Sequence, residues 1–153
     1  MKWMQVVLFI GLISGAAWGQ LPSKAEKLVG TWKYKQKSGY EIWELDGGEL
    51  RGTAYRVNPK TGDSSKIEDS WIRKTNRNLI YTMKTHSFLS DSVRTNEYDF
   101  VGGKRKMKFY NIDSSVPYMV SYSFGFLNRK KLFVKIYYEE GEKPLKLTLT
   151  KVQ

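Results

Sequence analysis

The sequence predicts an all-β protein, an up-and-down antiparallel β-barrel of eight to ten strands with a short N-terminal helical turn. Ten short stretches either alternate between apolar and polar residues or are rich in aromatic and β-branched residues. Short segments of turn residues, such as glycine, asparagine, aspartate and proline, separate them, and no long stretch has helical periodicity. A β-sandwich shares these features, so the closure of the sheet is left for the structure to decide.

Residues 1–19 are expected to be a cleaved secretory signal peptide. They carry one early cation, Lys2, an apolar core over 6–13, and small residues before the expected cut after Gly19, with a cut after Ala16 as the alternative. The apolar core is far shorter than the roughly 20 residues of a spanning helix, so the protein is not expected to span a membrane. The pattern predicts an exported protein, periplasmic or secreted.

Residues 20–153 are expected to form a single barrel domain. Removal of Lys2 with the signal peptide takes the formal net charge from +11 to +10. The chain has no cysteine, so its stability depends on the packed core rather than on disulfides. Export without disulfides suits a bacterial periplasm or surface. A basic exported protein is expected to meet an anionic envelope component or a protein rather than nucleic acid.

The first expected element is one helical turn from Lys24 to about Leu28, because Ser23 and Glu26 have the spacing of a capping box. All later elements are expected to be strands joined by turns. They are expected near 29–37, 40–45, 49–57, 66–74, 78–85, 93–101, 105–112, 118–127, 131–139 and 145–152.

The first hairpin has a predicted register. A two-residue turn at 38–39 sets Gln36 opposite Glu41 and Tyr34 opposite Trp43. Lysines then gather on the other face, which is therefore the outer one. The inner face carries Trp32, Tyr34, Gln36, Glu41, Trp43 and Leu45.

The second hairpin is expected to turn at 47–48. This register sets Trp43 opposite Gly52 and Glu41 opposite Ala54. The inner wall would then be bulky on the first two strands and small on the third, which is compatible with either close packing or a cavity.

The last hairpin has two apolar faces. One face carries Leu132, Val134 and Ile136 of the second strand with Ser121 and Ser123 of the first. This face is expected to point inward, because the charged residues Lys135 and Glu139 lie on the other face. The opposite face would expose a cluster of aromatics and mark a contact with a partner, a second copy or a membrane surface. This face carries Val120, Tyr122, Phe124, Phe126, Phe133 and Tyr137.

Glu41 is a carboxylate on an apolar face, where desolvation raises the pKa and requires a hydrogen-bond partner. It either orients a ligand or acts as an acid or base, or it forms an ion pair with a cation such as Arg56 or Arg73. The single histidine, His86, is expected to be an ordinary loop residue. The chain has one histidine and no cysteine, so a metal site is not expected. It has no strained nucleophile turn, so a catalytic triad is not expected either. No cofactor is expected.

Three segments carry a resemblance to a known family. Gly30, Thr31 and Trp32 are similar to the Gly-x-Trp start of lipocalin-like, or calycin, barrels. The segment "YEIWELDGGELRG" resembles the Tyr-Glu-Glu-Trp segment of an uncharacterised family of small exported bacterial lipocalin-like barrels. In it Glu41 and Trp43 match, and Ile42 replaces the second glutamate.

The segment "FYNIDSSVPYMVSY" resembles a second motif of the same family, in a degenerate form. Phe109, Asn111, Pro117 and Tyr122 match, whereas Ser114 and Ser115 stand where the family has histidine and aspartate. The resemblance implies a lipocalin-like fold for most of residues 28–152. It implies no activity, since the family has none that is settled.

The sequence therefore predicts a non-enzymatic protein that binds a small apolar or amphipathic molecule inside the barrel. An interaction module that uses exposed aromatics and the basic surface is the alternative. A hydrolase or isomerase that uses Glu41 is a third hypothesis. The candidate ligand-binding residues are Trp32, Tyr34, Gln36, Glu41, Trp43, Tyr81 and Asn111.

Overall fold

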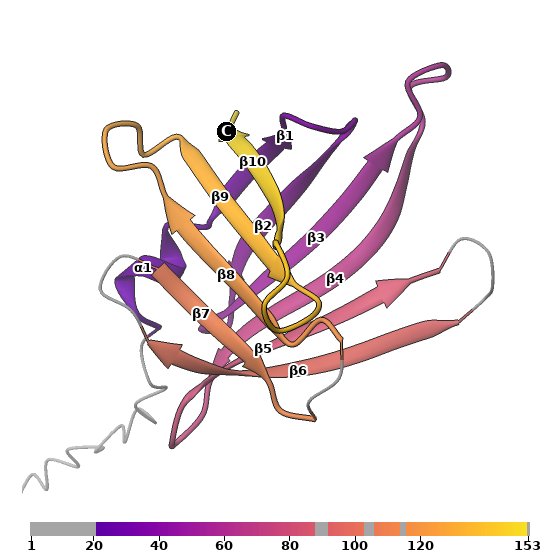
Figure 1. Cartoon of the computed structure of the whole chain (residues 1–153). Coiled ribbons are helices and arrows are strands. Elements are labelled where there is room, and N and C mark those ends of the chain that lie inside the picture. The colour runs from indigo at the N-terminus through magenta and orange to yellow at the C-terminus, as the bar shows by residue number, and fades with distance from the viewer. Residues whose placement is uncertain (1–20, 88–91, 103–105, 114–115, 153) are drawn as a thin grey trace, which may run out of the picture.

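The computed structural model describes residues 21–87, 92–102, 106–113 and 116–152. The expected signal peptide, residues 1–19, lies outside this part of the chain. The described residues form one short helix and ten strands (Figure 1). These are α1 (Ser23–Glu26), β1 (Gly30–Tyr34), β2 (Gly39–Asp46), β3 (Glu49–Val57), β4 (Ser64–Lys74), β5 (Leu79–His86), β6 (Val93–Gly102), β7 (Lys106–Asn111), β8 (Met119–Phe124), β9 (Lys131–Tyr137) and β10 (Leu145–Lys151).

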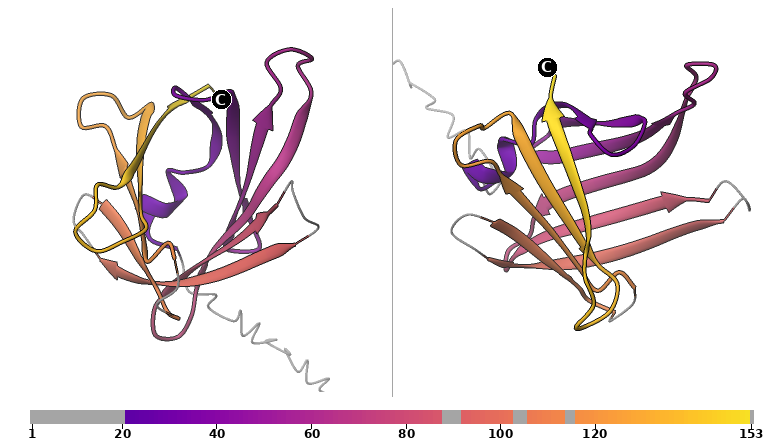
Figure 2. Two further views of the ribbon diagram at one scale, coloured as in Figure 1. Left: turned by 45° about the vertical axis from the view of Figure 1, so that its right-hand side comes forward. Right: turned by 45° about the horizontal axis from the view of Figure 1, so that its top comes forward.

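The ten strands form one closed antiparallel barrel. Each strand pairs with its neighbour in the chain, and β10 closes the sheet by pairing with β1, where Tyr34 lies opposite Leu149. The strands curve around a common interior (Figure 2). The predicted fold class is therefore confirmed, and closure decides for a barrel over a sandwich. Within the described residues, no helix is long and apolar enough to cross a membrane.

The β2–β3 register is as predicted. Trp43 lies opposite Gly52 and Glu41 opposite Ala54, across a turn in which Gly47 and Gly48 both have positive φ. A Cβ atom added at Gly52 would lie only 2.8 Å from the Trp43 ring. The Trp43 indole therefore fills the space above Gly52, and the small side chains of β3 leave no cavity there.

The predicted register of the β1–β2 hairpin is wrong by four residues. Trp32, not Gln36, lies opposite Glu41. The reason is closure of the barrel: beyond Tyr34 the chain turns to β10, where the Lys35 amide donates to the Thr148 carbonyl (2.8 Å). A shift of four keeps the faces, because side chains alternate with period two. Leu45, however, lies beyond the paired residues of β1 and is 52% exposed.

The predicted inner face of the last hairpin is correct for β9 and wrong for β8. Tyr122 lies opposite Val134 and Phe124 opposite Leu132, so the β8 aromatics point inward with the β9 aliphatics. The pairing differs from the predicted one by an odd number of residues, and such a shift exchanges the two faces of a strand. Of the aromatic cluster expected outside, only Phe133, which is 38% exposed, and the half-buried Tyr137 keep that position on the strands.

The helix α1 packs against one end of the barrel. Ala25 and Leu28 are fully buried, and the Trp32 indole N–H donates to the Leu28 carbonyl (2.6 Å), which ties the helical segment to β1. The helix is shorter than predicted. The expected capping box is absent: Pro22 is the N-cap, and no side chain caps the helix.

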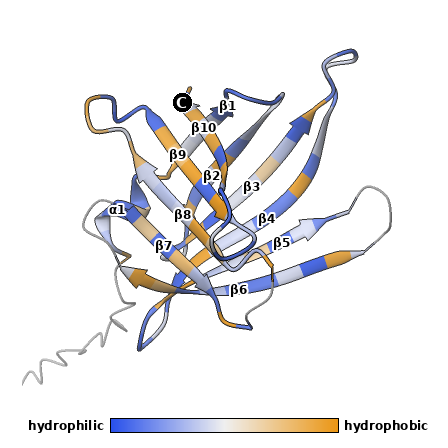
Figure 3. Cartoon of the chain, viewed as in Figure 1, coloured by the Kyte–Doolittle hydropathy of each residue, from blue (hydrophilic) through white to orange (hydrophobic). Residues whose placement is uncertain are grey.

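The interior is lined by apolar and aromatic side chains. Hydrophobic and hydrophilic residues alternate along the strands (Figure 3), as expected of a sheet with one buried face. The largest fully buried side chains fill the end nearer α1 and the middle of the barrel. They are Trp32, Tyr81, Tyr98, Phe109, Leu28, Leu50, Ile72, Leu132, Leu149 and Val120.

Candidate functional site

The polar groups of the interior gather toward the barrel end opposite α1, which we call the open end. Two carboxylates lie at the same level there: Glu41 of β2 and Glu68 of β4 both lie opposite Ala54 of β3. Because Ala54 is small, nothing large separates the two side chains along the inner wall. The site is therefore built from three adjacent strands.

Glu41 is held by two neighbours. The Tyr34 hydroxyl donates to one carboxylate oxygen, and the Trp43 indole N–H donates to the other (3.1 Å). Burial raises the pKa of Glu41, while these two hydrogen bonds and the charge of Lys37 oppose the rise. Burial and the adjacent Glu41 also raise the pKa of Tyr34.

The expected ion pair of Glu41 with Arg56 or Arg73 is not formed. Arg73 points outward and pairs with Glu97 (3.1 Å). A tyrosine and a tryptophan donor can satisfy a carboxylate inside an aromatic barrel without a second charge, which avoids the cost of desolvating an arginine.

Glu68 is the second acidic group of the interior. The Ser70 hydroxyl donates to it (2.8 Å), and the Tyr81 hydroxyl lies 3.5 Å from the same oxygen. Burial, followed by the charge of Glu41, raises the pKa of Glu68 to about 7. Glu68 therefore changes its charge near neutral pH.

A chain of hydroxyl groups leads from Glu68 into the core. Ser70 and Tyr81 are joined by a hydrogen bond of 3.2 Å, and Tyr81 and Tyr122 by one of 3.1 Å. The Tyr122 ring stands edge-on to that of Trp43, with centroids 6.2 Å apart. Burial raises the pKa of both tyrosines, so they remain neutral and carry hydrogen bonds rather than charge.

A cavity of about 450 Å³ opens beside Glu68. Its wall combines apolar side chains, such as Met83 and Ile136, with the polar groups of Arg94 and Asn96. We call it the mouth pocket. It is lined by Glu68, Met83, Thr85, Ser87, Ser92, Arg94, Asn96, Val116, Pro117, Ile136 and Tyr138.

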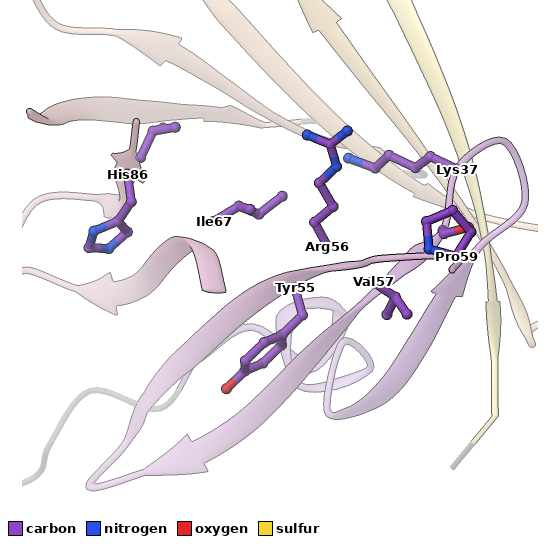
Figure 4. Close-up of a pocket in the computed structure, with 9 residues that line it drawn as sticks. Lys37, Tyr55, Arg56, Val57, Pro59, Ile67 and His86 are labelled. Carbon is purple, nitrogen blue, oxygen red and sulfur yellow. The ribbon is translucent and has the colours of Figure 1, made fainter. Parts of the chain in front are cut away.

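A second hollow of about 580 Å³ lies beside it, at the rim (Figure 4). Lys37 and Arg56 extend to one side of β3 in this hollow, whereas Tyr55 and Val57 point to the other side. Thr85 lines both hollows. The rim hollow is larger, and no carboxylate lines it, so it adds positive charge beside the acidic mouth pocket.

Lys37 connects the rim to the buried acids. Its ammonium group lies 4.0 Å from the centroid of the Tyr34 ring, a cation–π arrangement. Its charge lowers the pKa of both Glu41 and Glu68 against the effect of burial. The open end thus has cations at the rim and carboxylates beneath them.

The structure brings four of the seven sequence-predicted residues together: Tyr34, Glu41, Trp43 and Tyr81 form the inner network. The other three lie elsewhere. Trp32 packs at the α1 end. Gln36 is exposed, and its side-chain oxygen accepts from the Thr148 amide (2.9 Å). Asn111 shapes a turn by donating to the Pro117 carbonyl (3.2 Å).

The sequence did not predict Glu68, Ser70 and Tyr122 of the inner network, or any residue that lines the mouth pocket. Alternation over 66–74 places Glu68, Ser70 and Ile72 on one face, which was a usable signal. A register shift between Ala54 and Tyr55 hid the position of Glu68 opposite Ala54, because a bulge breaks the pairing that a turn would extend.

The single histidine, His86, lies on a strand and not in the loop where it was expected. His86 lies at the end of β5, where its Nε2 is 3.0 Å from Asp69. Among the residues that the structure describes, no group of three or more histidine, cysteine or acidic side chains is arranged to hold a metal ion. The arrangement can orient a polar group and exchange a proton at Glu68.

The sequence matches no protein-family model, and no curated protein matches it significantly. The closed ten-stranded antiparallel barrel is consistent with a lipocalin-like, or calycin-like, fold. The open end therefore provides the observations that bear on function.

Proposed function

We propose that this protein binds a small amphipathic molecule in the mouth pocket and does not transform it. The observation that carries the proposal is the composition of that pocket. Met83, Pro117 and Ile136 offer apolar surface, while Glu68, Arg94 and Asn96 offer polar groups that converge on the same space. Concave sites with apolar walls and few polar groups are typical of small-molecule binding.

Packing limits how deep such a ligand enters. The Trp43 ring fills the space above Gly52. The Tyr81 ring packs against those of Tyr98 and Phe109, with centroids 5.5 Å and 5.2 Å apart. The ligand is therefore held at the open end. The aromatic wall that the sequence suggested for the ligand serves as the floor beneath it.

The contacts of Glu41 argue against catalysis by this residue. Both of its oxygens already accept hydrogen bonds, from Tyr34 and Trp43, so it is held as a structural acceptor. Glu68, beside the cavity, is the acid that a ligand would meet. A hydrolase or isomerase that uses Glu41 is thus the weaker hypothesis.

We also propose export to a periplasm or secretion. The signal-peptide pattern of residues 1–19 and the absence of cysteine support this location. The resemblance to small exported bacterial barrels supports it too. N-terminal sequencing of the protein from its own cells tests it: a chain that begins at Gln20 is expected, and a mature chain that retains Met1 would contradict it.

A matched pair of substitutions tests the binding site. Thr85 faces the open end and lines both hollows, whereas Thr95, on the neighbouring strand, lies on the outer face opposite Lys84. Thr85→Trp fills the mouth with an indole, and Thr95→Trp adds the same indole outside. Both sites are exposed, so neither change disturbs the core.

The assay is a fluorescence titration with Nile red, a neutral amphipathic dye. Saturable binding is expected for the wild-type protein and for Thr95→Trp. For Thr85→Trp a loss of at least tenfold in affinity is expected, at unchanged thermal stability. Equal affinity in all three proteins, or saturable binding in none, would show that the mouth pocket is not a ligand site.

A further inference from the structure

The loop between β8 and β9 exposes two large apolar side chains in succession. Phe126 is 83% exposed and Leu127 is 94% exposed, the highest values among the exposed large apolar residues of the described chain. Large apolar groups concentrated at one point of a soluble surface mark a contact site. This loop lies at the α1 end of the barrel (Figure 1), away from the mouth pocket.

Basic side chains surround this tip. A hollow of about 630 Å³ is lined by Lys24 and Lys27 near α1, by Arg129 and Lys130 of the loop, and by Lys151 of β10, together with Phe124, Gly125 and Phe126. No acidic residue lines it. We call Lys24, Lys27, Phe126, Leu127, Arg129, Lys130 and Lys151 the basic apolar face.

Three cations of this face are not neutralised within the described chain. Among the residues that the structure describes, Lys27, Arg129 and Lys130 form no salt bridge. Each therefore offers a full positive charge to a partner.

The loop is held in a defined turn. The Gly125 amide donates to the Lys131 carbonyl (2.8 Å), and the Lys131 amide donates to the Asn128 carbonyl (3.0 Å). The Lys130 amide donates to the Asn128 side-chain oxygen (2.9 Å). A Cβ atom at Gly125 would lie 2.5 Å from the Asn128 carbonyl oxygen, so glycine is required there. The apolar tip is thus presented by an ordered structure.

We propose that the basic apolar face docks the protein onto the surface of an anionic lipid bilayer. A bilayer interface offers phosphate headgroups to the lysines and arginine and an acyl boundary to Phe126 and Leu127, so it accounts for both features at once. A soluble polyanion would use the cations alone. A second copy of this chain would bring two positive faces together, which repulsion opposes.

Docking through this face leaves the mouth pocket accessible, because the two lie at opposite ends of the barrel. Docking and ligand binding are independent: a barrel with no ligand can still dock, and a ligand-binding barrel can still be free in solution.

Vesicle flotation tests the proposal, with protein from the soluble fraction of cells that express the whole sequence. Vesicles contain phosphatidylcholine either alone or with 30% phosphatidylglycerol. Phe126→Ser combined with Leu127→Ser removes the apolar tip, and Arg129→Gln combined with Lys130→Gln removes two charges. Matched controls at the open end are Val93→Ser and the pair Lys60→Gln with Lys143→Gln.

The wild-type protein is expected to bind the anionic vesicles and not the neutral ones. The charge variant is expected to bind about 25-fold more weakly, about fivefold for each cation near the surface. The apolar variant is expected to lose at least tenfold, and the controls to stay within twofold of wild type. Undiminished binding of the apolar variant, or competition by soluble polyphosphate as strong as that by vesicles, would overturn the proposal.

A local probe provides a second measurement. The sequence has no cysteine, so Leu127→Cys and Lys60→Cys each give one labelling site for a polarity-sensitive dye. Anionic vesicles are expected to shift the emission at position 127 to shorter wavelength and to leave position 60 unchanged. An unchanged emission at position 127, or an equal shift at both positions, would contradict docking through this face.

Discussion

The raised pKa of Glu68 predicts a specific dependence of stability on pH. In the unfolded chain a glutamate titrates near 4.5, whereas in the barrel the pKa of Glu68 is raised to about 7. Below pH 4.5 the group is protonated in both states and has no effect. As the pH rises from 4.5 to about 7, Glu68 loses its proton in the unfolded chain before it does so in the barrel, so the free energy of unfolding falls. Above pH 7 the full penalty is present.

The size of this loss of stability follows from the rise in the pKa of Glu68. A difference of about 2.5 units at 1.36 kcal/mol per unit destabilises the folded protein by at most about 3 kcal/mol above pH 7. Glu68→Gln removes the ionisation and keeps an oxygen that accepts from Ser70. The variant is therefore expected to be as stable as wild type near pH 4.5 and more stable at pH 8.

The assay is urea unfolding followed by tryptophan fluorescence at pH 4.5, 6, 7 and 8. The control is Glu97→Gln, which removes an exposed carboxylate paired with Arg73 and is expected to change stability by less than about 1 kcal/mol at every pH. A Glu68→Gln variant that gains nothing over wild type between pH 4.5 and 8 would refute the reasoning.

Three further substitutions test the interior by the same unfolding assay. Glu41→Leu leaves the Tyr34 and Trp43 donors without an acceptor and is expected to lower the free energy of unfolding by about 2–4 kcal/mol. Glu41→Gln is expected to cost less, because its amide oxygen accepts from Trp43 and its amide N–H donates to the Tyr34 hydroxyl. Equal losses in the two variants would contradict this network. Gly52→Ala pushes a methyl group against the indole opposite and is expected to cost about 1–3 kcal/mol, while Thr53→Ala, on the outer face, is expected to cost less; the reverse order would show that the indole yields freely. Trp32→Phe removes the hydrogen bond to Leu28 and is expected to cost about 1 kcal/mol and to speed amide exchange in α1, and unchanged exchange would show that this bond does not hold the helix.

The parts of the fold that depend on local chemistry are predictable from the sequence. The two glycines at 47 and 48 specify a tight turn, and they set Trp43 opposite Gly52 as the structure has it. Alternating polarity similarly locates all ten strands to within a few residues. These signals are local, so they do not depend on which strands meet at closure.

The parts that depend on tertiary pairing are not predictable in this way. The β1–β2 hairpin takes its register from β10, a strand more than one hundred residues away, through bonds such as that from the Lys35 amide to Thr148. Glu68 is hidden behind a bulge in the β3–β4 pairing. The contacts around Tyr34 and Glu41 were thus partly accessible from the sequence. None of the predicted ligand residues lines the mouth pocket, whose lining is assembled only in the closed barrel.

The orientation of the last hairpin shows a further limit. Charge on β9 correctly places Lys135 outward, but the face of β8 follows from the length of the connecting loop. In the structure the inward turn of Tyr122 supplies the end of the hydroxyl chain. The exposed apolar groups are consequently found at the loop tip, at Phe126 and Leu127, rather than spread over the strands.

The central claim is that the mouth pocket holds a small molecule, and native mass spectrometry tests it most directly. Wild-type protein, Thr85→Trp and Thr95→Trp are purified from their own cells and sprayed without denaturation. An added mass of a few hundred daltons is expected on the wild type and on Thr95→Trp, and not on Thr85→Trp. The same added mass on Thr85→Trp, or none on any of the three, would contradict the claim.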